Sequence, residues 1–235
     1  MLIARVLPLP LLRSVGFAYG LNVSRRSYSQ YGEDLIVSNY FKCKGIRLGT
    51  YIDIGCFHPT WLSNTHLFHR LGWHGHAIDI DPYKLLAFRL CRRRRVTTYL
   101  AAVVGSSPEN EFASVYRFNR IWSEIDTLDR KTAEESRMAT GIGYRENKVK
   151  VMLFDELIQK IGYVNFLNVD VEGLDKEIIL RLRPDLGRPD VIVFEDGVCW
   201  GGSIESIEHL KRLGYVHLFT SGGSIGYCLP LTTAG

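Results

Sequence analysis

The chain has 235 residues, of which 46% are hydrophobic and 23% are charged, so it encodes a domain with a sizeable core rather than a disordered segment. Its net charge of +4 arises entirely from residues 1–32, which contain four arginines and no acid: Arg5, Arg13, Arg25 and Arg26. Basic and aromatic residues do not interleave along a stripe, which argues against a nucleic-acid partner.

Residues 1–28 form an apolar and basic N-terminal extension. Its uninterrupted apolar run, Val6–Leu12, is too short to span a bilayer. Pro8 and Pro10 break a continuous amphipathic helix at this point. We expect the extension to pack on the rest of the chain or to touch a membrane surface; a secretion signal is a less favoured alternative, because no small-residue cleavage site is clear.

The cysteines are odd in number, widely spaced and without a C-x-x-C motif: Cys43, Cys56, Cys91, Cys199 and Cys228. This pattern favours reduced, mostly buried thiols over a disulfide framework. It predicts a cytoplasmic protein.

From Ser29 onward, amphipathic helices alternate with short apolar strands. Ser29 is expected to cap the first helix, and Ser63 the second. The further predicted helices are residues 83–95, 174–182 and 204–213, and the predicted strands are residues 50–54, 75–81, 96–105, 164–173, 190–196, 215–219 and 226–230. This alternation predicts an α/β fold in which helices cover both faces of a mainly parallel sheet.

Residues 105–150 interrupt the alternation. The stretch "EFASVYRF" predicts one extra strand, and the residues after it are polar with scattered glycines. A long irregular insertion in a compact domain is often a lid or a substrate-binding loop. An ordinary mobile surface loop explains the same pattern equally well.

Acidic residues recur at the carboxyl ends of four predicted strands: Asp53, Asp79, Asp170 with Glu172, and Glu195 with Asp196. In an open parallel sheet these ends meet at one edge, where ligands bind near the switch in strand order. Carboxylates are costly in apolar strands unless they have partners. Their repetition on four strands therefore predicts a ligand site at this edge.

Gly55 and Asp79 indicate what kind of ligand binds there. A glycine directly after a strand lets the backbone turn sharply beside a ligand, and an acid ending the next strand can hold both hydroxyls of a ribose. No G-x-G-x-x-G phosphate loop follows the strand. This combination suits a nucleoside without phosphates, such as S-adenosylmethionine.

Two other side-chain clusters have simpler explanations. Five histidines crowd residues 58–76, but their spacing matches no metal motif, so we predict no metal site. His58, directly after the first strand, is the histidine expected to face the pocket. The run from Arg92 to Arg95 is expected to be a solvated helix end rather than a phosphate-binding patch.

The motifs together resemble the FkbM family of S-adenosylmethionine-dependent methyltransferases. The resemblance covers residues 29–196 and rests on blocks that occur in the family's order: "SQYGED", "YIDIGCFHP", "SNTHLFHRLGWHGHAIDIDP", "VKVMLFDEL", "VNFLNVDVEGLDKEIILRL" and "PDVIVFED". It implies a Rossmann-like class I methyltransferase fold with a seven-stranded sheet. Residues 29–235 would then form the methyltransferase domain.

The resemblance also implies which residues bind the cofactor. Asp53 and Gly55 would form the turn near its methionine part, with Cys56 in the same turn. Asp79 would bind the ribose hydroxyls, although Asp81 is an alternative ribose acid, and both lie on one face by strand alternation. Ile80 and Ala102 would flank the adenine. Cys56 and Pro59 depart from the small residues common in this turn.

Characterised members of the family methylate hydroxyl groups on sugars, glycans or polyketides, so O-methylation is the implied reaction. An alcohol needs a base as it attacks, and Asp170, Glu172 and His58 are the candidates. Glu172 can instead cap the following helix. Asp170, Glu172 and Glu195 together can alternatively hold a divalent metal.

Three residues are candidates for contacting the methyl acceptor: Gln30 and Glu33 in "SQYGED", and Trp122 in the insertion. A well-capped helix and ordinary loop packing are their simpler explanations. Two other functions stay open, a nicotinamide-dependent oxidoreductase on a related fold and an inactive nucleoside- or glycan-binding member. The missing phosphate loop disfavours the first, and the retained acids disfavour the second.

Overall fold

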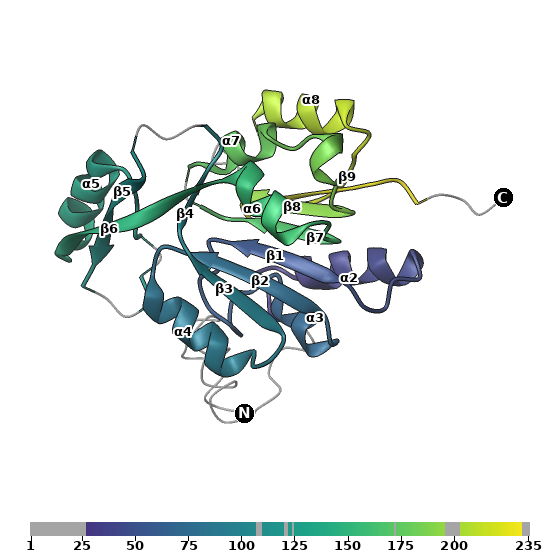
Figure 1. Ribbon diagram of the computed structural model, residues 1–235, viewed down its shortest axis with the longest axis horizontal. Helices are drawn as coiled ribbons and strands as arrows, with labels where there is room; N and C mark the ends of the chain where they lie inside the picture. The colour runs from purple at the N-terminus through teal and green to yellow at the C-terminus, as the bar shows by residue number, and fades with distance from the viewer. Residues whose placement is uncertain are drawn as a thin grey trace, which may run out of the picture.

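The computed structural model describes residues 27–106, 110–119, 122–123, 125–171, 173–195 and 203–231. These residues form a large sheet with helices on both faces and a smaller sheet beside it (Figure 1). Most of the predicted N-terminal extension, together with Glu172, Asp196 and Cys199, lies outside them. Within the described ranges, no helix combines the length and apolar composition that crossing a membrane requires.

The large sheet has seven strands in the order β3-β2-β1-β7-β8-β10-β9. Strands β3, β2, β1, β7 and β8 are parallel, and β10 runs antiparallel to both of its neighbours. The bounds are Thr50–Ile54 for β1, His74–Asp79 for β2, Val96–Leu100 for β3, Phe166–Val169 for β7, Val191–Glu195 for β8, Val216–Ser221 for β9 and Ser224–Cys228 for β10. The prediction of a mainly parallel seven-stranded sheet is confirmed.

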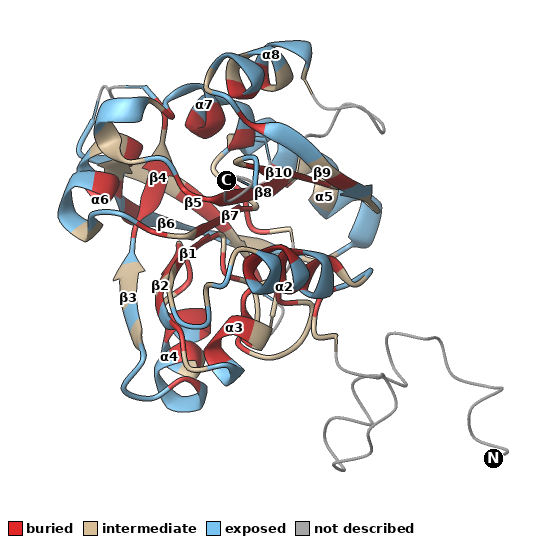
Figure 2. Ribbon diagram, turned by 90° about the vertical axis from the view of Figure 1, so that its right-hand side faces the viewer, coloured by how far each residue is buried: buried red, intermediate tan, exposed pale blue. Residues whose placement is uncertain are grey.

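Helices cover both faces of this sheet (Figure 2). Helices α2 (Glu33–Cys43), α3 (His66–Arg70) and α4 (Pro82–Cys91) contribute to the cores on one face. The other face packs against α6 (Phe154–Ile161), α7 (Asp175–Leu180) and α8 (Ile204–Arg212), and a short 3-10 helix spans Pro184–Leu186.

Side-chain alternation in the central strands explains the two layers. In β1, Ile52 and Ile54 join the core under α6–α8, whereas Tyr51 joins the core under α2 and α3. In β7, Leu167 and Phe166 divide between the faces in the same way. All of these side chains are buried, and each such burial stabilises the fold by about 1.5–3 kcal/mol.

The predicted third strand and the predicted irregular insertion both differ from the structure. Residues 96–105 divide into β3, in the large sheet, and β4 (Ala102–Val104), in the smaller sheet. Ala101 lies in the core under α6–α8, whereas Ala102 packs with Val115 and Val149, so the chain changes sheets between these two alanines. An uninterrupted apolar sequence gives no sign of that change.

The insertion itself is ordered into strands and a helix. Strand β5 (Phe112–Phe118) is the predicted extra strand, and helix α5 (Arg130–Thr140) and strand β6 (Tyr144–Leu153) follow it. Strand β6 pairs with β4 on one side and with β5 on the other, giving the order β4-β6-β5. The description of this insertion as irregular is therefore wrong.

Two helix starts and the burial of the thiols also differ from expectation. Helix α2 begins at Glu33 after Gly32, although Ser29 Oγ still accepts hydrogen bonds from the N–H groups of Gly32 and Asp34, at 3.1 and 3.3 Å. Helix α3 begins at His66, three residues after Ser63. Of the four described cysteines, Cys43 and Cys91 are exposed, and Cys56 and Cys228 are buried.

Candidate functional site

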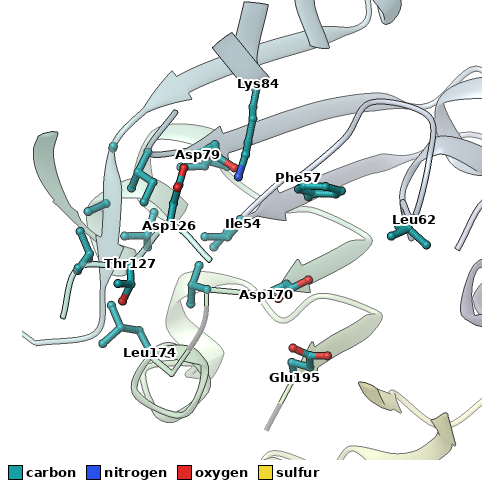
Figure 3. A pocket seen from close by; sticks show the side chains of 18 of the residues that line it. Ile54, Phe57, Leu62, Asp79, Lys84, Asp126, Thr127, Asp170, Leu174 and Glu195 are labelled. Atoms are coloured by element: carbon teal, nitrogen blue, oxygen red, sulfur yellow. The ribbon is translucent and has the colours of Figure 1, made fainter. Parts of the chain in front are cut away.

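A cavity of about 260 Å³ lies at the carboxyl ends of β1, β2, β7 and β8. The switch in strand order falls between β1 and β7, because the chain runs from β1 outward through β2 and β3 before it returns on the other side at β7. This is where ligands bind in open parallel sheets. Of the acids predicted to gather there, Asp79, Asp170 and Glu195 line the cavity (Figure 3).

The turn after β1 requires glycine at position 55. Gly55 has φ of +79°, and a Cβ there would lie 1.7 Å from the carbonyl oxygen of Asp170. The N–H groups of Gly55 and Cys56 donate to the carbonyl of Ile78, at 2.9 and 3.1 Å. The turn is thus held between β2 and the residue after β7, and Gly55 lines the cavity.

Two neighbours of this glycine lie behind the cavity wall instead. Asp53 is buried and accepts hydrogen bonds from Thr65 Oγ1 and from Asn168 Nδ2, the latter at 3.0 Å. Cys56 packs with Ala77 and residues of α4, and burial raises the pKa of its thiol. Asp53 therefore joins β1, β7 and the loop before α3, and Cys56 fills the core beneath the turn.

The structure distinguishes Asp79 from Asp81. Asp81 caps α4 by accepting a hydrogen bond from Tyr83 N at 2.8 Å, and it forms an ion pair with Arg117 at 2.6 Å. The Asp79 side chain lines the cavity, with Lys84 close by (Figure 3). Burial raises the pKa of Asp79 to about 6, against the opposing effect of Lys84. Hydroxyl donors from a ligand would stabilise this buried carboxylate in its charged form.

The wall beside Asp79 is largely apolar and comes from two parts of the chain. Ile80 and Ala102 line it as expected. Asp126, Thr127 and Leu128, which follow β5, line it as well, and the sequence analysis did not single them out. The backbone there is fixed, because Asp126 Oδ1 accepts from Phe118 N at 2.9 Å. The sequence offers one indication that this segment lines a site: in "EIDTL" the acid Asp126 stands among apolar residues.

The other end of the cavity carries Asp170 and Glu195, with Phe57, Leu62 and Gln30 around them. Figure 3 shows the two carboxylates on the side away from Asp79, Lys84 and Asp126. Glu172, the other predicted carboxylate base, lies outside the described residues. The two ends of the cavity therefore differ: one has Asp79 and Asp126 with Lys84 beside them, and the other has Asp170 and Glu195.

His58, one of the predicted bases, does not line the cavity. Its Nδ1 accepts hydrogen bonds from the backbone N–H groups of Thr60 and Trp61, at 3.2 and 3.0 Å, so its proton lies on the other ring nitrogen. Burial, and then the charge of Arg92, lower the pKa of His58 to about 4, which keeps the ring neutral at pH 7. The imidazole packs on Trp122, with ring centroids 4.4 Å apart.

Trp122 and Glu33, two of the predicted acceptor-binding residues, have local partners. Trp122 meets the His58 ring at a tilt and the Phe57 ring edge-on, and it does not line the cavity. Glu33 is buried and accepts a hydrogen bond from Tyr31 N at 2.8 Å. The structure thus brings Gln30, Gly55, Asp79, Ile80, Ala102 and Asp170 to the cavity, and leaves Glu33, Asp53, Cys56, His58 and Trp122 outside its lining.

Arg92 is buried, so the expectation of a solvated helix end is wrong for this residue, whereas Arg93, Arg94 and Arg95 are exposed. Its guanidinium donates to Tyr51 Oη at 2.9 Å, to Thr65 Oγ1 and Ser63 Oγ at 2.8 Å each, and to the carbonyl of Pro59 at 2.9 Å. These contacts tie the end of α4 to the loop between β1 and α3. That loop carries Phe57 and Leu62 into the cavity wall.

The histidine cluster provides no metal centre among the described residues, where no group of three or more His, Cys, Asp or Glu is placed to hold an ion. His66 and His69 stack on one another with ring centroids 6.0 Å apart. Burial lowers the pKa of these side chains to about 3 and about 4. Glu172, one member of the alternative metal set, lies outside the described residues.

The cavity fits the cofactor that the sequence predicts. A nucleoside needs an acceptor for its ribose hydroxyls and an apolar slot for its base, and Asp79 beside Ile80 and Ala102 offers both. Gly55 lines the cavity as well, so a ligand can approach the backbone of this turn.

Comparisons with known proteins identify the family. The family model described as the methyltransferase FkbM domain matches residues 48–216. No curated protein matches the chain in sequence. Similar solved structures include a putative caffeoyl-CoA O-methyltransferase from Staphylococcus aureus, with 8% identity, a TM-score of 0.46, and 97% of this chain and 95% of that chain covered. An O-methyltransferase from Bacillus cereus in complex with SAH has 14% identity, a TM-score of 0.43, and 96% and 94% covered.

These structural likenesses are distant, and the family model carries the assignment because it spans more than half of the chain. It includes the turn at Gly55, the carboxylate of Asp79 and both acids at the opposite end of the cavity. The chain therefore belongs to the FkbM family of methyltransferases, and its cofactor is S-adenosylmethionine.

Proposed function

We propose that the chain transfers a methyl group from S-adenosylmethionine to a hydroxyl group of a sugar, a glycan or a related natural product. The observation that carries this proposal is the pair of carboxylates, Asp170 and Glu195, at the end of the cavity away from Asp79. A hydroxyl group needs an acceptor for its proton when it attacks, and a carboxylate can provide one.

The cofactor residues have separate tasks in this proposal. Asp79 accepts both ribose hydroxyls, and Ile80 and Ala102 contact the adenine. The turn at Gly55 lies beside the methionine part. S-adenosylmethionine supplies a methyl group that its positively charged sulfur already activates.

The remaining task of the chain is to align the acceptor oxygen and to remove its proton. Asp170 is the proposed base, because it lines the cavity and its backbone is fixed by a 2.9 Å hydrogen bond from its N–H to the carbonyl of Ile54. General-base catalysis of this kind contributes about 10²- to 10⁴-fold to the rate. Closing the site from water and holding the acceptor in line with the methyl group supply further acceleration.

Transfer of a labelled methyl group tests this function. The full chain is incubated with S-[methyl-³H]adenosylmethionine and a panel of methyl glycosides, and NMR of the product locates the methyl group. We expect an O-methyl ether. Asp170→Asn should lower kcat by about 10²- to 10⁴-fold, with the Kd for S-adenosylhomocysteine unchanged. Asp185→Asn, at an exposed aspartate paired with Arg183, is the control.

A methyl group found on nitrogen or carbon, or a wild-type chain that methylates no hydroxyl in the panel, would contradict the proposal.

We also propose that the protein acts in the cytoplasm and that residues 1–28 contact a membrane surface. Co-sedimentation of the full chain and of a chain lacking these residues with anionic lipid vesicles tests the second point. Equal sedimentation of both would refute it.

A further inference from the structure

The loops that lead into β1, β2 and β3 meet at the end of the sheet opposite the cavity. The three strands are parallel neighbours, so their amino ends lie together, whereas the cavity lies at their carboxyl ends. A Cβ on Gly72 would lie 3.2 Å from Leu48 Cδ2 and 3.4 Å from Arg95 Nη1, so the three loops are in direct contact. We call this the basal surface, which consists of the exposed side chains of residues 42–49, 70–73 and 89–95.

The basal surface is basic. Residues 35–52, 54–78 and 82–108 contain no acid, and each of the three loops lies within one of these ranges. Its exposed cations are Lys42, Arg47, Arg70, Arg89, Arg93, Arg94 and Arg95. None of them forms an ion pair with any residue that the structure describes.

Cations in other parts of the molecule have acidic partners. Lys44, the half-buried lysine of the loop before β1, pairs with Asp190. On the exposed surface, Lys176 pairs with Glu205 at 2.5 Å. The unpaired cations of the basal surface therefore repel one another without a local counter-charge, and an anionic partner would relieve this repulsion.

Exposed leucines stand among these cations. Leu48, Leu71 and Leu90 are 69%, 47% and 56% exposed. Leu86, one turn before Leu90 on α4, is 46% exposed as well. A single exposed leucine is ordinary, but several beside unpaired arginines combine apolar area with positive charge. This is the combination that binds the headgroup region of an anionic bilayer.

We infer that the basal surface docks on an anionic lipid membrane, with its leucines entering the interface and its arginines at the lipid phosphates. Nucleic acid would attract the same charges through its phosphates, but it would leave the leucines in water. The inference goes beyond methyl transfer and does not depend on the identity of the acceptor. It is also separate from a contact through residues 1–28, because the basal surface belongs to the folded body.

Docking through this surface would fix the orientation of the site. Strand β1 has five residues, so its two ends lie about 17 Å apart. The cavity at the far ends of β1 and β2 would then face the solution rather than the lipid. The membrane would locate the protein, and the acceptor would enter from the aqueous side.

Charge reversal tests the electrostatic part. Sedimentation of the full chain with vesicles of phosphatidylcholine, with and without phosphatidylglycerol, gives the partition coefficient. Arg93→Glu/Arg94→Glu reverses two charges of the basal surface, and the control Arg145→Glu/Lys148→Glu reverses two exposed charges on β6, so both variants have the same net charge.

We expect the wild type to prefer the anionic vesicles, and Arg93→Glu/Arg94→Glu to bind them at least about 30-fold more weakly. Each basic residue near an anionic surface contributes about a factor of five. The control should stay within about threefold of wild type, because screening confines the attraction to charges near the lipid.

Leu48→Ser tests the apolar part, and Leu231→Ser, at an exposed leucine beyond β10, is its control. Leu48→Ser should lower the partition coefficient by about fivefold through lost burial at the interface, and Leu231→Ser should leave it unchanged. Calorimetry should give a Kd for S-adenosylhomocysteine within about twofold of wild type in every variant, since none of the changed residues lines the cavity. That result shows that the variants are folded.

The inference fails if the wild type does not sediment with anionic vesicles. It fails equally if Arg93→Glu/Arg94→Glu loses no more binding than its control, because the contact then lies elsewhere, for example in residues 1–28. Unchanged binding in Leu48→Ser would remove the leucines from the contact. Duplex DNA is measured in parallel, and tighter binding to DNA than to vesicles, lost in the same arginine variant, would assign the surface to nucleic acid instead. The methyl-transfer assay tests the proposed function independently of all these results.

Discussion

The two faces of the central strands hold the molecule together in different ways. Toward α6–α8, β1 and β7 present Ile52, Ile54 and Leu167 to a core of apolar side chains. Toward α3 and α4, the same strands present Asp53 and Asn168 to a buried polar network that also contains Thr65 and Arg92.

The difference follows from what each face supports. The apolar face supplies cavity-wall residues such as Ile54, Ala101 and Val103, and packing holds these side chains in place. The polar face must hold the loop between β1 and α3, whose backbone turns beside the cavity and needs directional partners. Hydrogen bonds from one guanidinium supply several of them at once. The first face is thus held by apolar packing, whereas the second combines an apolar core that includes Tyr51 and Phe166 with the hydrogen bonds that hold this loop.

The largest effect is expected from Arg92→Met. It leaves Pro59 O, Ser63 Oγ and Thr65 Oγ1 without the buried cation that donates to them, and removing one partner from a buried charged network costs about 3–5 kcal/mol. Denaturant unfolding measures the change. Arg93→Met, at the exposed neighbouring position, should stay within about 0.5 kcal/mol of wild type. A loss below about 1 kcal/mol in Arg92→Met would show that the polar face is not held by this arginine.

Leu157→Ala tests the apolar face. Leu157 on α6 is fully buried in the core under α6–α8, and its truncation should cost about 3 kcal/mol of unfolding free energy through lost burial and a cavity. Because Leu157 itself does not line the cavity, the folded variant should keep its Kd for S-adenosylhomocysteine. In Arg92→Met that Kd should rise. Equal changes in this Kd in Leu157→Ala and Arg92→Met would contradict the assignment of different roles to the two faces of the strands.

The pH dependence of stability reports on Asp175, which lies at the start of α7 behind the loop after β7. Burial raises the pKa of Asp175 to about 7, Glu195 adds to the rise, and the backbone N–H of Val171 donates to its Oδ2 at 3.3 Å. Because the folded pKa lies above the unfolded value of 3.8, the stability that this group gives below about pH 4 is lost as pH rises toward 7.

Asp175→Asn should therefore raise the free energy of unfolding at pH 8 by about 1–2 kcal/mol and change it little at pH 4, since asparagine can still accept from Val171 N. Thermal unfolding at both pH values measures this. Asp185→Asn is the exposed control. A pH-independent change in Asp175→Asn would mean that this carboxyl group is not the one that titrates in this range.

Much of this architecture was predictable, because the spacing of apolar residues along the chain indicates which positions are buried. Strand Thr50–Ile54 was predicted to the residue, since an apolar run bounded by glycines leaves little choice of bounds. Asp79 was assigned to the site because an acid at the end of a buried strand needs a partner. The assignment over Asp81 needed the structure, which shows Asp81 engaged by Tyr83 and Arg117.

What was missed depends on contacts between distant residues. Arg92 lies in a run of four arginines, and nothing local indicates that one of them meets Pro59 and Thr65 in the interior. The change of sheet after Leu100 depends on pairing with β6, about fifty residues later. The sequence analysis named Glu195 as a strand-end acid and as a member of an alternative metal set, but gave it no separate role, because Gly223, which makes space for it, lies in a different hairpin.

The most direct test of the account is to measure the binding of S-adenosylhomocysteine by thermal shift. The proteins compared are the wild type, Asp79→Asn and the control Asp155→Asn, and NAD is the comparison ligand. At about a hundredfold its Kd, a ligand that binds the folded chain adds roughly 2.7 kcal/mol, which raises the Tm visibly. The account predicts a shift with S-adenosylhomocysteine and none with NAD, retained in Asp155→Asn and largely lost in Asp79→Asn. An unchanged shift in Asp79→Asn, or a shift with NAD alone, would contradict the assignment of this cavity to the cofactor.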